Sequence, residues 1–240
     1  MATVLVTGAN RGLGFEFVRQ YAAAGWHVIA CARRPPAATA LAALAQASGG
    51  RVVIEPLDVL DHAGVDAAAR RLEAQAIDVL LHCAGTMGRG STRETGFPTN
   101  RFGELDYEDW DTIFRVNVAG PMKVTEAFVA HVARSTQKKI VALSSNLGSI
   151  ASIRTGGIYA YRGSKAALNA VMKALAIDLA RKHGIIVATV HPGWVHTDMG
   201  GPRADIDAPE SVAGLVKVID GLDAGKAGRF WRYDGTELPW

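Results

Sequence analysis

The chain has 240 residues, 49% of them hydrophobic, and a formal net charge of +3. This much apolar material excludes a disordered chain and is enough for one large core or two small ones. The charge is small and the arginines are scattered, which argues against nucleic acid as a partner.

The two cysteines, Cys31 and Cys83, each stand at the end of an apolar run. Two cysteines make no disulfide framework of the secreted type, so we expect reduced thiols in the core and no metal site. The first residues, MATVLVTG, lack the basic and apolar regions of a signal peptide, and no apolar run reaches the length of a membrane span. We therefore expect a cytoplasmic protein.

Short hydrophobic runs alternate along the chain with longer helical patterns. Runs of this kind, rich in β-branched residues, are typical of strands buried on both faces of a parallel sheet. The alternation predicts an α/β fold, a Rossmann-type doubly wound parallel sheet with helices on both faces and right-handed crossovers. The predicted strands are residues 3–7, 27–32, 51–57, 78–85, 139–145 and 185–193, and the predicted helices include 12–24, 61–75, 106–134 and 159–182.

The residues between these elements indicate where helices start and where ligands bind. Asp106 and Asp207 precede helical runs and are predicted N-caps. Two segments, about 86–104 and 194–206, match neither helix nor strand and follow predicted strand ends, where open α/β sheets bind ligands. No repeat or linker interrupts the chain, so we predict one domain over residues 1–240 with these segments as substrate loops.

A glycine-rich turn joins the first predicted strand to the first helix. In TGANRGLG the glycines follow a G-x-x-x-G-x-G spacing ahead of an amphipathic helix. Glycines let the backbone approach a pyrophosphate, whose charge then faces the N-terminal amides of the helix. Three glycines alone are a weak signal, but the strand before and the helix after favour a dinucleotide site over a plain turn. The predicted cofactor-binding residues here are Gly8, Asn10, Arg11, Gly12, Leu13 and Gly14.

The end of the second predicted strand bears on the choice of cofactor. It reads ACARRP, without the Asp or Glu that often binds the 2′-hydroxyl of the adenosine ribose. Arg33, with Arg11 closing from the glycine turn, would instead pair with a 2′-phosphate. NADP(H) is therefore the predicted cofactor. Arginines that are merely solvent-exposed at a strand end remain the alternative.

The stretch GGIYAYRGSKAALNAVMKAL, residues 156–175, places a tyrosine four residues before a lysine. Positions i and i+4 share a helix face, so we expect Lys165 within a few ångströms of the Tyr161 phenol, whereas Tyr159 has Gly163 at that position. A nearby cation lowers the pKa of an acid by about 1 to 3 units, here from a usual value of about 10. Such a phenol is suited to act as a general acid on a ketone or as a base on an alcohol.

Five motifs follow one another along nearly the whole chain. They are the glycine turn, Asn117 in RVNVAGP, SSNLGS at 144–149, the Tyr161-x-x-x-Lys165 pair and HPGWVHTDM at 191–199. In this order they resemble the short-chain dehydrogenase/reductase family. The segments IYAYR, TDMGG and YDGTELPW look most like its branch of C-factor and sniffer-type carbonyl reductases.

The resemblance implies a role for each of four residues. Tyr161 would donate a proton to the substrate carbonyl oxygen while hydride arrives from the nicotinamide. Lys165 would lower the pKa of the phenol and bind the nicotinamide ribose. Ser145, three residues before the glycine of SxxG, would polarise the carbonyl, although a serine that only caps local backbone is the alternative for this residue alone. Asn117, expected inside a helix, would hold a water in the proton relay.

The chain departs from the family pattern after the fourth predicted strand. The usual NNAG is here His82-Cys83-Ala84-Gly85. Ala84 and Gly85 keep the small surface that the cofactor ribose needs, and His82 is expected to be a core histidine bonded to backbone and not a catalytic one. Extra residues at 154–157 are expected to alter the rim of the site. The resemblance also implies cofactor contacts from Asp58 (adenine), Val59, Ala84, Gly85, Pro192, Gly193, Val195 and Thr197 (the last two with the carboxamide).

The predicted function is NADPH-dependent reduction of a ketone, aldehyde or quinone to an alcohol. The alternative is an NADP(H)-binding regulatory protein with little turnover, against which the intact set of four residues argues. The predicted partner is a small molecule, without nucleic acid or membrane, and the family resemblance implies a homodimer or homotetramer. A mainly apolar substrate pocket is expected, walled by Met87, Phe97, Phe102, Trp194 and Met199.

Overall fold

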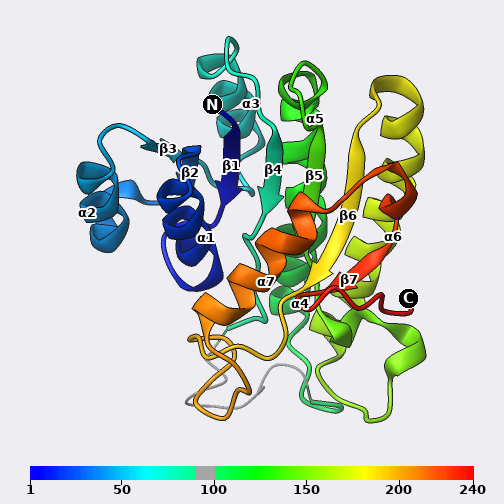
Figure 1. Ribbon diagram of the computed structural model, residues 1–240. Helices are drawn as coiled ribbons and strands as arrows, with labels where there is room; N and C mark the ends of the chain where they lie inside the picture. The colour runs from blue at the N-terminus through cyan, green and yellow to red at the C-terminus, as the bar shows by residue number, and fades with distance from the viewer. Residues whose placement is uncertain (90–100) are drawn as a thin grey trace.

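One parallel sheet runs through the centre of the molecule (Figure 1). The computed structural model describes residues 1–89 and 101–240, and within them seven strands pair in the order β3-β2-β1-β4-β5-β6-β7, all parallel. The strands are β1 (Thr3–Thr7), β2 (His27–Ala32), β3 (Val52–Pro56), β4 (Val79–His82), β5 (Lys139–Leu143), β6 (Ile186–His191) and β7 (Phe230–Arg232). The doubly wound sheet that the sequence predicted is confirmed, and the three-residue β7 is an addition to it.

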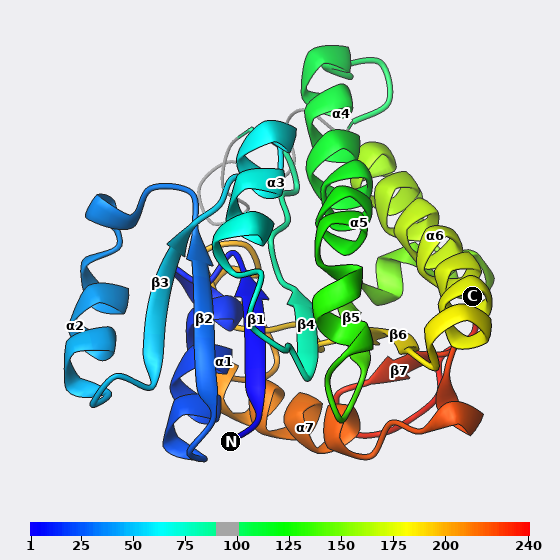
Figure 2. The same ribbon diagram turned by 90° about the horizontal axis from the view of Figure 1, so that it is seen from above.

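Helices cover both faces of this sheet (Figure 2). Phe17, Leu41 and Leu215 pack in one core cluster, which places their three helices on one face. Val65, Phe128 and Met172 pack in a second cluster on the opposite face. The first face carries α1 (Gly12–Ala23), α2 (Thr39–Ala47) and α7 (Ala208–Asp220), and the second carries α3 (His62–Arg71), α5 (Gly120–Ala133) and α6 (Tyr159–His183), with α4 (Tyr107–Phe114) beyond α5.

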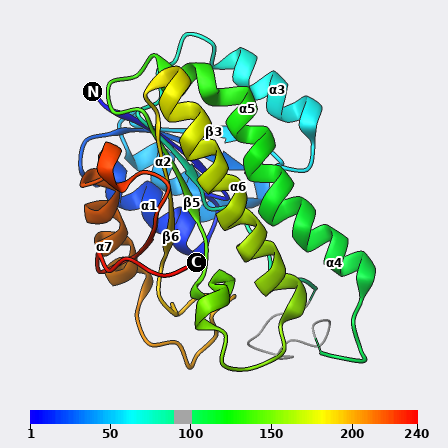
Figure 3. The same cartoon turned by 90° about the vertical axis from the view of Figure 1, so that its right-hand side faces the viewer.

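The predicted helix over 106–134 is continuous in direction but not in hydrogen bonding. A π-helical segment, Arg115–Ala119, joins α4 to α5, and the two helices run in line beside α6 (Figure 3). Such single-turn widenings occur often at functional sites. Asn117 lies in the middle of this segment, so it stands inside a helix as predicted, but in a π-helical turn that the sequence did not indicate.

The two predicted N-caps behave differently. The Asp106 carboxylate accepts hydrogen bonds from the backbone amides of Glu108 and Asp109, both at 3.0 Å, as predicted. Asp207 makes no side-chain cap, because its carboxylate lies 2.9 Å from Nδ1 of His196 instead. That contact ties the start of α7 to the predicted loop 194–206.

The loops that follow the strands gather at one edge of the sheet, the lower edge in Figure 1. β1 lies between β2 and β4, so the strand order reverses there, which is where sheets of this kind bind ligands. The loop 194–206 contains only an isolated bridge between Val195 and Ile206. In the described part of the chain, no helix has both the length and the apolar character needed to cross a membrane.

Candidate active site

The four predicted catalytic residues come from three elements and are all buried. Ser145 follows β5, Tyr161 and Lys165 stand on α6, and Asn117 lies in the π-helical segment. Their exposed fractions are 8%, 6%, 5% and 0%, respectively. The Lys165 ammonium lies 5.7 Å from the centre of the Tyr161 ring, and the Ser145 hydroxyl hydrogen-bonds to the phenol. The structure therefore brings the predicted set together.

The environment of the Tyr161 phenol differs from the sequence prediction. Burial raises its pKa to about 12, and the hydrogen bond with Ser145 lowers it. Removing a phenol from water disfavours the charged phenolate, and here this effect exceeds the lowering of the pKa by the hydrogen bond with Ser145. The prediction that Lys165 brings the pKa of the phenol below its usual value is therefore wrong for this structure. The consequence is that Tyr161 is protonated at neutral pH, which is the form that donates a proton.

Lys165 has its own partner within the protein. Its Nζ donates a hydrogen bond to the main-chain oxygen of Leu143 at 2.8 Å, at the end of β5. Burial lowers the pKa of Lys165 to about 8, while the thiol of Cys83 raises it. The backbone of Gly85, which has no side chain, passes close to Lys165: a Cβ added to Gly85 would lie 3.8 Å from Nζ.

Asn117 ties two elements together through its side chain. Its Oδ1 accepts from the backbone amide of Thr86 at 2.9 Å, and its Nδ2 donates to the Thr86 carbonyl at 2.8 Å and to the Ser164 hydroxyl at 3.0 Å. Both amide hydrogens are thus engaged. This side chain holds the segment after β4 against α6, so a role in holding a relay water does not follow from its contacts.

The segment that carries Ser145 packs directly on α6. A Cβ on Gly148 would lie 2.7 Å from the Lys165 carbonyl carbon, so only glycine allows this approach. The Ser145 Oγ accepts from the Leu147 amide at 3.2 Å and lies 3.4 Å from Oδ1 of Asn146. The local backbone cap that was the alternative for Ser145 is therefore present together with its bond to Tyr161.

The departures after β4 are accommodated by a hydroxyl that sequence reasoning missed. Oγ1 of Thr7 accepts from the backbone amides of Cys83 and Ala84, both at 3.1 Å, so β1 braces the segment after β4. His82 is a core residue as predicted, but its Nε2 lies 3.0 Å from the hydroxyl of Thr125 instead of bonding backbone. Burial lowers the pKa of His82 to about 3. A hydroxyl at the last position of a strand before a glycine turn was the available signal for Thr7.

The glycine turn has the close packing expected of a phosphate cradle. Gly8 adopts a positive φ of 68°, and a Cβ there would lie 2.8 Å from Cα of Ala84. A Cβ on Gly14 would overlap the carbonyl oxygen of Gly8. The turn is also joined to β2, because the Ala9 amide donates to the Cys31 carbonyl at 2.9 Å. Asn10, Arg11 and Gly12 stand exposed along it, and Leu13 is half-buried.

The predicted cations at this end of the sheet face solvent. Arg33 and Arg34 are exposed just beyond β2, and in the described part of the chain neither has an ion-pair partner. Arg11 does have one, since its Nη1 lies 3.2 Å from Oδ2 of Asp198, with side chains 74% and 68% exposed. The loop 194–206 thus reaches the glycine turn.

The remaining predicted cofactor positions border the same edge. Asp58 is half-buried and Oδ1 of its carboxylate accepts from the Leu60 amide at 3.0 Å, while Val59 is buried against Gly120. Beyond β6, the Pro192 carbonyl accepts from the hydroxyl of Ser211 at 2.6 Å. A Cβ added to Gly193 would collide with the side chain of Ile206, so this position is closely packed. Val195 is buried. The methyl group of Thr197 lies 3.8 Å from the position that a Cβ on Gly12 would take.

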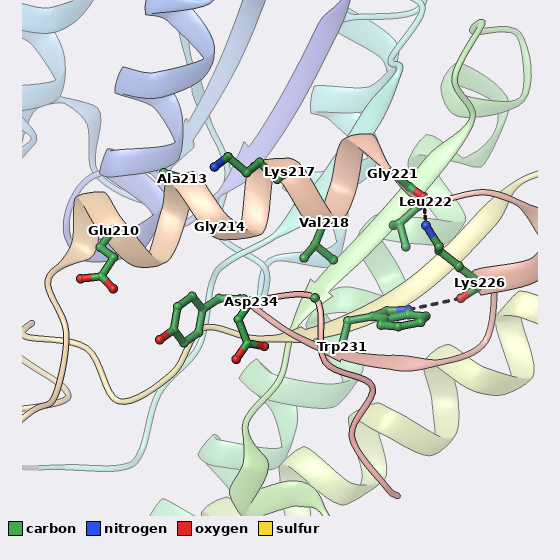
Figure 4. A pocket seen from close by; sticks show the side chains of 12 residues that line it. Glu210, Ala213, Gly214, Lys217, Val218, Gly221, Leu222, Lys226, Trp231 and Asp234 are labelled. Carbon is green, nitrogen blue, oxygen red and sulfur yellow. Dashed lines mark hydrogen bonds between the residues drawn. The ribbon is translucent and has the colours of Figure 1, made fainter.

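Two cavities differ in their relation to these residues. The larger, about 550 Å³, lies between α7 and residues 221–235, where Lys217, Trp231 and Asp234 line it (Figure 4). None of the predicted site residues lines it, so its size alone does not make it the active site. The smaller, about 220 Å³, is lined by Asn146, next in the chain to Ser145, and by His191, Gly193, Trp194, Asp205, Arg232 and Leu238.

The smaller cavity is more polar than the predicted substrate pocket. Of the predicted wall residues only Trp194 lines it, and Phe102 is 86% exposed, edge-on to the Tyr159 ring at 6.4 Å. Met87 and Met199 belong to neither cavity, and Phe97 lies outside the described residues. The polar members of this cavity come from β6, β7 and residues 146 and 205, which are far apart in the sequence. The apolar wall of the substrate pocket stays a prediction.

Comparison with known proteins agrees with this arrangement. A family model described as short chain dehydrogenase matches residues 2–207. C-signal from Myxococcus xanthus is 42% identical over 164 residues, which cover 68% of this chain and 93% of that relative. Two solved structures match along the whole chain: the carbonyl reductase Sniffer of D. melanogaster (32% identity, 100% of that chain, TM-score 0.87) and the NADPH-bound carbonyl reductase from chicken fatty liver (33% identity, 99% of that chain, TM-score 0.89). With its serine, tyrosine and lysine gathered beside a glycine turn, the chain belongs to the short-chain dehydrogenase family of oxidoreductases.

Proposed function

We propose that this protein is an NADPH-dependent carbonyl reductase that converts a ketone, aldehyde or quinone to an alcohol. The observation that carries the proposal is the buried cluster of Ser145, Tyr161 and Lys165, in which the phenol is hydrogen-bonded to the serine and lies beside a cation. The similarity to carbonyl reductases, one of them bound to NADPH, supports the same reaction and cofactor.

The residues present fit a nicotinamide dinucleotide. Between Gly8, Gly14 and Ala84 no side chain fits, which leaves bare backbone at the start of α1 for a pyrophosphate. Arg33 would meet the 2′-phosphate, Asp58 the adenine, and Lys165 the nicotinamide ribose across Gly85. Bound there, the reduced cofactor supplies the hydride for the reaction.

The chain's own residues would supply the proton and polarise the substrate. The Ser145 hydroxyl donates a hydrogen bond to the substrate oxygen and increases the positive charge on its carbon. Tyr161 gives up its proton to that oxygen as the alkoxide forms. Its raised pKa keeps it protonated beforehand, and the charge of Lys165 stabilises the phenolate afterwards.

The substrate would enter where the small cavity adjoins Ser145. Asn146 and Gly193 line that cavity, and they neighbour the catalytic serine and the predicted nicotinamide contacts, respectively. The loops 86–104 and 194–206 are the proposed walls. Because Arg232 and His191 also line the cavity, a carbonyl compound with a polar substituent fits it better than a purely apolar one.

The test is a panel of ketones, aldehydes and quinones assayed by oxidation of NADPH and of NADH. Tyr161→Phe removes the proton donor and should lower kcat by about 100-fold or more. Tyr159→Phe, two residues earlier on the same helix and partly exposed, is the matched control and should leave kcat unchanged. Unchanged turnover in Tyr161→Phe would refute the proposed role, and tight NADPH binding without reduction of any carbonyl would favour the regulatory alternative.

A further inference from the structure

The segment after β7 folds back and ends against the loop that carries the catalytic serine (Figure 1). The main-chain oxygen of Trp240 accepts a hydrogen bond from the Ala151 amide at 3.0 Å and another from the Ser149 hydroxyl at 3.1 Å. Ser149 is buried, and its Oγ also lies 2.8 Å from that of Ser152. The serine loop is therefore bonded to a residue about ninety positions away in the sequence.

The ring of Trp240 is held on two further elements. It stacks on Phe230 of β7, with ring centres 5.8 Å apart and planes inclined by 14°. The ammonium of Lys173, on α6, lies 5.1 Å from the ring centre. Backbone bonds keep the segment in place, since the Leu238 amide donates to the Phe230 carbonyl at 2.7 Å. Trp240 thus joins the edge of the sheet, the helix that carries Tyr161, and the serine loop.

Short bonds connect this contact to the catalytic serine. The Ser149 amide donates to the Asn146 carbonyl at 3.0 Å, and the Gly148 amide donates to the Ser145 carbonyl at 2.8 Å. On its other side the loop abuts α6, where Gly148 touches the Lys165 backbone. The loop is therefore enclosed between α6 and Trp240, with Ser145 at its start.

We propose that Trp240 is a positioning residue for the reaction: by holding Ser149 and Ala151, it keeps the Ser145 hydroxyl beside the Tyr161 phenol, where both can reach the substrate oxygen. The inference rests on the proposed function for its catalytic consequence. Without the ring of Trp240 the segment 236–240 loses its seat on Phe230 and Lys173, and the buried Ser149 hydroxyl loses an acceptor. Displacements of about 1 Å at a reacting group reduce rates by up to about 100-fold.

The decisive variants are Trp240→Ala, which removes the ring, and Trp240→Phe, which keeps an aromatic ring over Phe230. We expect Trp240→Ala to lower kcat by about tenfold or more. The Kd for NADPH should change less than about twofold, because β4, β5 and β6 separate β1, which leads into the glycine turn, from β7. Trp240→Phe should recover most of kcat.

Two further measurements separate positioning from a general loss of stability. Trp26→Ala removes another packed tryptophan, whose ring is tilted against Tyr21 with ring centres 4.8 Å apart, just before β2 and one strand from the opposite edge of the sheet; it should leave kcat unchanged. Ser149→Ala deletes one bond to Trp240 without touching the ring and should lower kcat in the same direction by a smaller factor. Amide hydrogen exchange at residues 146–152 should accelerate in Trp240→Ala.

Some outcomes would overturn the inference. An unchanged kcat in Trp240→Ala would do so, as would a decline of kcat and NADPH binding by the same factor. If the wild-type protein reduces no carbonyl, the proposed function fails, but the exchange measurement still decides whether Trp240 holds the serine loop.

Discussion

The predicted site has two halves that differ in how the protein prepares them. On the β5 and α6 side, Tyr161 and Lys165 are 94% or more buried, and each has a hydrogen-bond partner from the protein. On the β1 and β2 side, Arg11 and Arg33 are exposed to water. The predicted catalytic half therefore has its partners before any ligand binds, whereas in the predicted cofactor half Arg33 has no ion-pair partner among the described residues and Arg11 has only the exposed Asp198.

This difference follows from the free energy of burial. A buried polar group without a partner destabilises the fold by about 1–3 kcal/mol, so buried catalytic groups are held in fixed networks. An exposed arginine is well hydrated and gains little from a surface ion pair. Substitutions in the buried half should therefore have large effects that are insensitive to salt, and those in the exposed half smaller effects that salt weakens.

The largest effect in this comparison is expected from Lys165→Met. The substitution removes the cation beside the phenol and leaves the Leu143 carbonyl without its donor. We expect kcat to fall by about 100-fold or more, because the phenolate formed on proton transfer loses its nearest positive charge. Lys182→Met, at the exposed end of the same helix, is the control and should leave kcat unchanged.

The same variant tests the burial of Lys165 through stability. Burial lowers the pKa of Lys165 from 10.5 to about 8, so between these values the unfolded chain binds more protons than the folded one. Stability then rises with pH across this window, and methionine lacks that gain. Urea unfolding at about pH 7.5 and about pH 9 should show the wild-type free energy of unfolding rising relative to that of the variant; a constant difference would contradict the lowered pKa.

The order of motifs along the chain was enough to predict the sheet and the members of the buried half. The carboxyl ends of parallel strands meet at one edge of the sheet. Gly8, after β1, and Ser145, after β5, therefore lie at the same edge as the residues after β4 and β6. The spacing of Tyr161 and Lys165 placed them on one helix face. The strands, the helices and the shared face of Tyr161 and Lys165 needed only local periodicity and the rule that strands alternate with helices. Ser145 and Asn117 were predicted from the family resemblance.

The partners of those residues could not be predicted in the same way. Asn117 bonds Ser164, 47 positions away, from a π-helical turn that no local pattern marks. Whether the pKa of Tyr161 is raised or lowered depends on its burial, which becomes known only when the surrounding elements are placed. β7 and the contacts of Trp240 were not predicted, because a strand of three residues is too short to show a hydrophobic periodicity.

An intermediate effect is expected from Arg33→Asp in the exposed half. A carboxylate in place of the guanidinium repels a 2′-phosphate and can accept from a ribose 2′-hydroxyl. We expect the Kd for NADPH to rise by about 10- to 100-fold while that for NADH changes little or falls. Fluorescence titration at two salt concentrations measures both. Arg34→Asp, the adjacent exposed arginine, is the matched control, and an equal loss for NADPH and NADH in Arg33→Asp would remove the 2′-phosphate role.

The smallest effect, and the one most specific to the exposed half, concerns the ion pair between Arg11 and Asp198. If Arg11 also pairs with the 2′-phosphate, the carboxylate of Asp198 competes with the ligand for it. Arg11→Gln should then weaken NADPH binding by about threefold, whereas Asp198→Asn should strengthen it slightly, because exposed ion pairs contribute only about 0.2–1 kcal/mol. Titration at low salt should reveal the opposite signs, and high salt should reduce both changes. Weakening by both variants would mean that the pair holds the loop 194–206 over the glycine turn and favours the bound state, so that even this exposed contact is prepared before the cofactor arrives.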